Sequence, residues 1–100
     1  MESIKFRVLD FISRIPKGKV TNYDYIAKKL KIKSARLVGQ ILHKNPDPQK
    51  YPCHRVVFAD GGLSSAYAFG GAEKQREKLL REGITFSGNK VNQRHFIDSL

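Results

Sequence analysis

The chain has 100 residues and a mass of 11.4 kDa, and its 40% hydrophobic content with only 4 Pro and 8 Gly excludes a disordered polypeptide and predicts one self-folding domain, residues 1–100. Its 19 Lys and Arg against 9 Asp and Glu give a formal charge of +10, which favours a polyanionic partner such as nucleic acid. No apolar run approaches membrane-spanning length and no signal peptide is recognisable, so we expect a protein of the cytoplasm (in a prokaryote) or the nucleus, with no membrane partner.

The first segment predicts a helix, followed by a turn and a second, shorter helix. Apolar residues recur at helical spacing from Ser3 to Ile15, and Pro16-Lys17-Gly18 ends this pattern. Thr21, with Asp24 three residues later, resembles a capping box that opens the second helix.

A third helix is predicted directly after the Lys31-Ile32-Lys33 turn. Ser34 is its expected N-cap, and the helix is expected to run to about Lys44, before Asn45-Pro46. Two short helices joined by such a turn indicate a helix-turn-helix, in which the second helix contacts nucleic acid. The buried stripe of that helix is Leu37, Val38, Ile41 and Leu42, and its exposed positions include Arg36, Gln40, His43 and Lys44.

The second half predicts a short hairpin and one more long helix. Residues 55–58 read as a strand, 59–62 as a turn and 63–65 as a return strand, which would form a wing-like hairpin. Ala72 to Glu82 predicts an amphipathic helix with Leu79 and Leu80 inward, ended by Gly83. A short apolar segment at 84–86, a turn at 88–89 and a helical tail follow. The expected fold class is mostly α, a winged helix-turn-helix-like DNA-binding domain with a short β-hairpin.

The single cysteine, Cys53, is either a reactive group or a small buried hydrophobe. It cannot form an internal disulfide. Pro52-Cys53-His54-Arg55 places a thiol beside an imidazole and a guanidinium, and cationic neighbours lower a thiol pKa. One Cys and three scattered His lack paired ligand spacing, so no metal is predicted, and no motif implies another cofactor.

The segment Pro52-Cys53-His54-Arg55-Val56-Val57 resembles the active-site signature of the O6-alkylguanine-DNA alkyltransferases, also called methylated-DNA–protein-cysteine methyltransferases. The similarity extends over most of the chain, through Ile15 to Val20, Ala35 to Gln40, Asn45-Pro46 and Leu79 to Gly83. This resemblance implies a DNA repair protein that flips O6-alkylguanine out of double-stranded DNA and transfers the alkyl group irreversibly to its own Cys53.

The resemblance also implies catalytic roles around Cys53. His54 would relay a proton through a water between Cys53 and Glu82. Asn45 would brace the active-site turn, and Pro52 and Arg55 would support it, Arg55 by ion pairing. Without the resemblance, Glu82 reads as an ordinary surface carboxylate and Asn45-Pro46 as a turn.

Further roles follow for DNA and for the base. Arg36 matches the family's arginine finger, which fills the gap left by the flipped guanine, and Tyr23 matches a tyrosine beside the flipped nucleotide. Without the resemblance Arg36 reads as a phosphate contact or a solvated charge, and Tyr23 as a core aromatic. The other expected DNA-binding residues are Thr21, Ala35, Gly39 and Gln40, and the expected base-pocket residues are Val56, Val57, Ser65 and Tyr67.

Two departures from the family keep an alternative open. The larger N-terminal domain of the family is absent, so we expect a minimal enzyme, a fragment, or a monomeric module with a fused or partner domain. The segment 64–71 departs from the usual Asn-Tyr-Ser-Gly-Gly stretch. The alternative is a non-enzymatic alkyltransferase-like protein that binds alkylguanine and signals to nucleotide excision repair, although Cys53 favours the enzyme. A plain helix-turn-helix regulator would leave residues 52–57 without a purpose.

Overall fold

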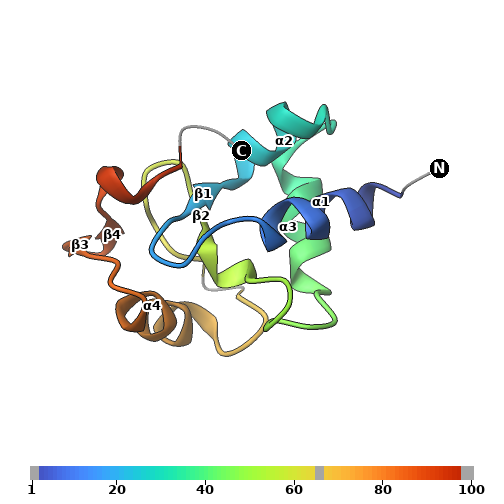
Figure 1. Ribbon diagram of the computed structural model, residues 1–100. Coiled ribbons are helices and arrows are strands. Elements are labelled where there is room, and N and C mark those ends of the chain that lie inside the picture. The colour runs from blue at the N-terminus through green and yellow to red at the C-terminus, as the bar shows by residue number, and fades with distance from the viewer. Residues whose placement is uncertain (1–2, 65–66, 98–100) are drawn as a thin grey trace.

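Figure 1 shows the computed structural model, which describes residues 3–64 and 67–97. Helices α1, α2 and α3 pack together, whereas α4 lies apart from them and packs against the 3-10 turn η1. The described part is mostly helical, as the sequence predicts. The elements are α1 (Ile4–Ser13), β1 (Thr21–Asn22), α2 (Tyr23–Leu30), α3 (Ala35–His43), η1 (Cys53–Arg55), β2 (Val56–Val57), α4 (Gly71–Arg81), β3 (Phe86–Ser87), β4 (Lys90–Val91) and η2 (Gln93–His95).

The predicted helix-turn-helix is confirmed as α2 and α3, with one correction at its start. Ser34 caps α3, and its Oγ accepts a hydrogen bond from the Leu37 N–H at 3.3 Å. Asn22, not Thr21, caps α2, and its Oδ1 accepts from the Tyr25 N–H at 2.8 Å. The capping box predicted at Thr21 is wrong because this residue is already in β1, where its side chain is buried.

The predicted hairpin over residues 55–65 is also wrong. Val56 and Val57 do form a strand, but β2 pairs in parallel with β1 rather than with the residues that follow it. After β2 the chain turns tightly, with Phe58 N–H donating to the Gly62 carbonyl at 2.9 Å, and residues 63–64 form no strand. A local alternation of apolar residues reveals a strand but not its partner, and here the partner precedes it by more than thirty residues.

The antiparallel hairpin of the described residues lies nearer the C-terminus. There β3 pairs with β4 around the turn at Gly88. Up to residue 97, where the described part of the chain ends, the predicted helical tail is present only as η2, because His95 and Ile97 use backbone groups to pair with Val20. Val20 N–H donates to the His95 carbonyl and Ile97 N–H donates to the Val20 carbonyl, each at 2.9 Å.

Buried side chains form two clusters on either side of the β1–β2 pair. The larger is built from α1, α2 and α3 with Cys53 and Val56, and the smaller contains Val20, Val57, Leu79, Ile84 and Val91. Adjacent strand residues point to opposite faces, so Val56 and Val57 join different clusters. On α4, Leu79 is buried as predicted, whereas Leu80 is 50% exposed, so its predicted inward position is wrong.

Gly61 fixes the turn after β2 against β4, and we expect its replacement to destabilise the fold. Its φ is +91°, and a Cβ there would lie 2.6 Å from the Val91 carbonyl oxygen. Gly61→Ala should therefore lower the free energy of unfolding by about 2 kcal/mol, measured by urea denaturation. Gly83→Ala is the matched control, because its φ of +86° is similar but nothing lies within 4 Å. A loss of about 1 kcal/mol is expected there, and equal losses would contradict the steric argument.

Candidate functional site

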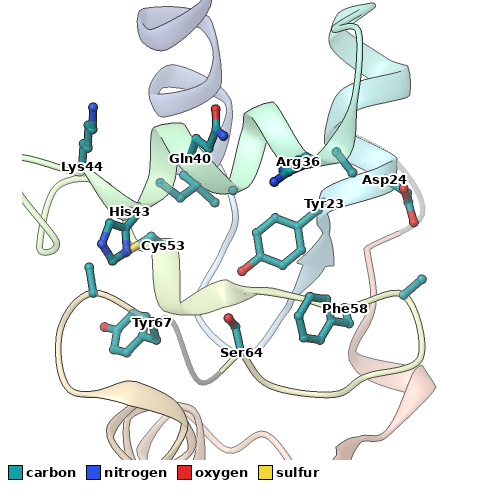
Figure 2. Close-up of a pocket in the computed structure, with 15 residues that line it drawn as sticks. Tyr23, Asp24, Arg36, Gln40, His43, Lys44, Cys53, Phe58, Ser64 and Tyr67 are labelled. Atoms are coloured by element: carbon teal, nitrogen blue, oxygen red, sulfur yellow. The ribbon is translucent and has the colours of Figure 1, made fainter.

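A cavity of about 840 Å³ lies between α3 and the loops that follow β2, and Cys53 is part of its wall. Figure 2 shows Arg36, Gln40 and His43 along α3, and Lys44 just after it, on one side of the cavity, with Phe58, Ser64 and Tyr67 on the other. A volume of this size is typical of small-molecule sites and would hold a nucleobase. The helix-turn-helix and the Cys53 turn therefore border one site.

The turn that carries Cys53 is held by backbone and side-chain hydrogen bonds. The Cys53 N–H donates to the Tyr51 carbonyl at 2.7 Å, and the Arg55 N–H donates to the Pro52 carbonyl at 2.9 Å. Asn45, which is buried at the end of α3, donates its Nδ2 to the same Tyr51 carbonyl at 2.7 Å. The structure thus places Asn45 where it can brace the turn, next to the buried Pro52.

The electrostatics of Cys53 differ from the prediction made from its sequence neighbours. The thiol is 5% exposed, and this burial raises its pKa above the ordinary value. A hydrogen bond with Asn45 and the charge of Lys78 lower the pKa in part. His54 and Arg55 do not supply the expected lowering: burial holds the pKa of His54 below its ordinary value, so its ring is neutral, and the Arg55 charge is already paired.

His54, Arg55 and Glu82 form one hydrogen-bonded network behind Cys53. His54 Nε2 lies 2.9 Å from Glu82 Oε2, and Arg55 donates Nε to Oε1 at 3.0 Å and Nη2 to Oε2 at 2.7 Å. Arg55 Nη1 also donates to the Ile15 carbonyl at 2.7 Å, so the Arg55 side chain joins Glu82 to the segment that follows α1. Burial raises the pKa of Glu82, but these hydrogen bonds outweigh it and hold the pKa below the ordinary value.

The His54–Glu82 contact selects one tautomer of the imidazole. A carboxylate can only accept, so His54 Nε2 carries the hydrogen and Nδ1 keeps a lone pair. Nδ1 is buried and has no hydrogen-bond partner among the described residues. A neutral His54 is therefore poised to accept a proton at Nδ1, and the imidazolium that forms would be stabilised by Glu82.

Aromatic side chains form the apolar walls of the cavity. Tyr23, Phe58 and Tyr67 line it, with the Tyr23 and Phe58 ring centroids 5.6 Å apart. Tyr67 in turn packs against Phe69, with 5.8 Å between the ring centroids. Burial raises the pKa of Tyr23 to about 12, so its hydroxyl stays protonated and can donate a hydrogen bond. Flat apolar walls with polar edges suit a planar ligand such as a base.

The α3 side of the cavity carries most of the predicted DNA-binding residues. Ala35, Arg36, Gly39 and Gln40 all line it, and Arg36 and Gln40 are exposed. Gly39 faces the Tyr23 ring, and a Cβ there would lie at ordinary van der Waals distance from the ring edge, 3.9 Å. These side chains are thus available to a partner on this face.

Some predicted site residues are not brought to the cavity. Thr21 is 1% exposed in β1, so its side chain is not available for the predicted DNA contact. Val56 and Val57 are fully buried in the two core clusters, because pairing with β1 encloses β2. They follow the Cys53 turn directly in the chain and anchor it to the core, and they do not line the cavity. Tyr67 does line the cavity, whereas Ser65 lies outside the described residues.

Two functional candidates on α4 were missed from sequence. Gln75 is fully buried, and its Nε2 donates to the carbonyls of His54 at 3.1 Å and Val56 at 3.0 Å. Lys78 Nζ donates to the Tyr67 hydroxyl at 2.8 Å. Gln75 and Lys78 precede the predicted Glu82 at helical spacing of seven and four residues, so both were predictable on the same face of α4.

Among residues 3–64 and 67–97, no group of three or more His, Cys, Asp or Glu is arranged to hold a metal ion. Within the same ranges, no helix has the length and apolar character needed to cross a bilayer.

The family profile of the 6-O-methylguanine DNA methyltransferase DNA-binding domain matches residues 3–84. The chain belongs to this family. It is therefore a member of the alkylguanine DNA repair proteins, which include both methyltransferases and Atl1-type proteins. The matched range includes the helix-turn-helix, the Cys53–Glu82 network and every residue that lines the cavity.

Relatives of both types are similar to this chain. The methylated-DNA–protein-cysteine methyltransferase of Candida glabrata is 38% identical over 89 residues, covering 88% of this chain and 42% of that protein. The DNA base-flipping protein of Escherichia coli is 36% identical over 89 residues and is covered over 67% of its length. S. pombe Atl1, solved in complex with damaged DNA containing O6-carboxymethylguanine, superposes with a TM-score of 0.81 and 26% identity, covering 99% of this chain and 100% of that one. The chain spans 28–54% of the first curated relatives that it matches.

Proposed function

We propose that this protein binds double-stranded DNA, flips an O6-alkylguanine into the cavity beside α3, and transfers the alkyl group to Cys53. The observation that carries the proposal is the placement of a buried thiol and a neutral imidazole held by a carboxylate at a cavity bordered by a helix-turn-helix. A plain DNA-binding domain has no need of such a network.

In the proposed reaction, His54 takes the proton of Cys53 at Nδ1, directly or through a water, while Nε2 remains bonded to Glu82. The thiolate sulfur then attacks the alkyl carbon, so that a C–S bond forms as the bond from that carbon to O6 breaks. The departing guanine takes up one proton, which balances the proton lost by the thiol. The thioether product has no route back to a thiol in this site, so each molecule reacts once.

The position of Cys53 and the family membership both support the proposal of base flipping. An O6 substituent lies within the base stack of a duplex, whereas Cys53 is recessed in the cavity wall. We propose that Arg36 enters the stack where the guanine leaves, and that Tyr23 and Tyr67 contact the extruded nucleotide. The formal charge of +10 favours the duplex as a polyanion, so binding to undamaged DNA should weaken steeply with salt.

A second function is favoured by one observation. The structure of S. pombe Atl1 superposes with a TM-score of 0.81, compared with 0.69 for the O6-methylguanine-DNA methyltransferase of Pyrococcus kodakaraensis. In that case the protein would bind alkylguanine without transferring the alkyl group. The burial that raises the Cys53 pKa is compatible with this alternative, since an unactivated thiol reacts slowly.

Mass spectrometry distinguishes these functions directly. The protein is incubated with a duplex containing O6-methylguanine, and the Cys53 peptide is then weighed. The proposal predicts a gain of one methyl group per protein, with turnover stopping at one. Tight lesion binding with an unchanged mass would establish the sensor and reject the transferase.

The control for this experiment is Cys53→Ala. It should gain no mass yet keep its affinity for the duplex, because the DNA-binding side chains come from α3 rather than from the turn of Cys53. Methylation of this variant would show that the acceptor is another residue.

A further inference from the structure

The residues adjacent to Cys53 in the sequence do not stabilise its thiolate form. Its thiol is buried, and burial disfavours the thiolate. His54 is neutral, and Arg55 is engaged by both carboxylate oxygens of Glu82. Any positive charge that acts on the thiolate must therefore come from elsewhere in the fold.

Lys78 meets this requirement from α4. Its Nζ donates to the Tyr67 hydroxyl at 2.8 Å and lies 5.3 Å from the centroid of the Tyr67 ring and 5.7 Å from that of Phe69. No carboxylate of the described residues lies within ion-pairing distance of Lys78, unlike Lys74 and Arg81 on the same helix, which pair with Glu77. Its ammonium is thus held in place by neutral groups, with no carboxylate of the described residues paired to it.

We propose that Lys78 is a positioning residue of the Cys53 site: its ammonium, anchored by Tyr67 at the cavity wall, stabilises the negative charge of the Cys53 thiolate. Tyr67 lines the same cavity as Cys53, so the hydrogen bond to Tyr67 holds the Lys78 ammonium beside this cavity. The half-buried position of Lys78 strengthens the interaction, because solvent screens it less than an exposed charge. Consistently, the Lys78 charge lowers the pKa of Cys53.

Other titratable groups around Cys53 are less suited to this role. On α3, Arg36, His43 and Lys44 border the cavity but are exposed. Tyr23 and Tyr67 are neutral, since burial raises the pKa of both phenols. The remaining groups that face the site are Asp24 at the cavity rim, the neutral His54, and the paired Arg55 and Glu82.

The test is the rate of Cys53 alkylation by iodoacetamide as a function of pH, which needs no DNA. In Lys78→Met the curve should move to higher pH, with alkylation at pH 7 slower by about a factor of ten and the plateau at high pH unchanged. Lys78→Arg should restore most of the rate. Tyr67→Phe keeps the ring but removes the anchor, so its curve should fall between the two.

Lys74→Met is the matched control, because Lys74 is on the same helix but exposed and paired with Glu77. Its curve should coincide with that of the unmodified protein. Circular dichroism verifies folding, and Lys78→Gln replaces the methionine variant if the latter unfolds. A Lys78 variant with an unchanged curve, or with only a lower plateau, would overturn the proposal, since a lower plateau reports access rather than charge.

This inference deepens the proposed function but fails separately from it. A Lys78-dependent pH curve in a protein that gains no methyl from damaged DNA would reject the transferase and keep the role of Lys78. If the protein does gain a methyl group but the pH curves of the unmodified protein and the Lys78 variant are identical, the transferase function is kept and the role of Lys78 is rejected.

Discussion

Replacing Glu82 with glutamine is expected to lower the free energy of unfolding by about 3 kcal/mol. The Glu82 and Arg55 side chains are only 12% and 16% exposed, and both carboxylate oxygens accept hydrogen bonds from the guanidinium. The glutamine amide would leave the Arg55 charge without a counter-charge in a poorly solvated place. Urea denaturation at pH 7 measures the effect.

Glu77→Gln is the matched control, since Glu77 is on the same helix and also pairs with an arginine, Arg81. Those side chains are 45% and 71% exposed, so the loss should be below about 0.5 kcal/mol. If the free energy of unfolding falls by similar amounts in the two variants, burial of the Glu82–Arg55 pair does not add to its stabilising effect.

The Glu82 effect should also depend on pH. Its pKa in the folded state is below the ordinary value of 4.5, so its stabilisation is fully present above about pH 4.5 and is lost as pH falls through the folded-state pKa. The difference between the unmodified protein and Glu82→Gln should therefore shrink below pH 4.5. A difference that stays constant to lower pH would mean that the carboxylate charge is not its source.

Arg36→Ala is expected to slow repair of a lesion in duplex DNA about a hundredfold, with little effect on reaction with free O6-benzylguanine. Only the duplex requires a base to be extruded and its place in the stack to be filled, at a cost of a few kcal/mol. Arg36 is exposed at the start of α3 on the cavity rim, where it can reach such a gap. Stopped-flow measurements at fixed salt and saturating DNA compare the two substrates.

Lys33→Ala serves as the control for charge, because Lys33 is exposed in the turn just before α3. It should weaken DNA affinity in a salt-dependent way but leave the rate at saturation unchanged. Equal losses on both substrates in Arg36→Ala would mean that Arg36 supports the pocket or the fold, and its assignment as a finger would be withdrawn.

Local patterns in the sequence predict the helices well and the strands poorly. The helix-turn-helix was predictable because α2 and α3 depend on their own periodicity, on the Ser34 cap and on the turn between them. The hairpin was misplaced because β2 consists of Val56 and Val57 alone, and nothing near them encodes pairing with Thr21 and Asn22. Strand pairing across such a distance depends on how the helices pack.

For the site, the sequence by itself determined the reactive motif and the family, since Pro52 to Val57 and the segments around it are contiguous patterns. Only the tertiary structure decided the chemistry of the thiol. Charges adjacent in sequence were expected to activate Cys53, but Arg55 and His54 are engaged by Glu82 at the C-terminal end of α4, and burial raises the thiol pKa. Lys78, twenty-five residues away in the chain, acts on Cys53 because α4 packs against η1. Electrostatic interactions depend on the distance between groups and on their exposure to solvent in the folded state, and proximity in the sequence determines neither of these.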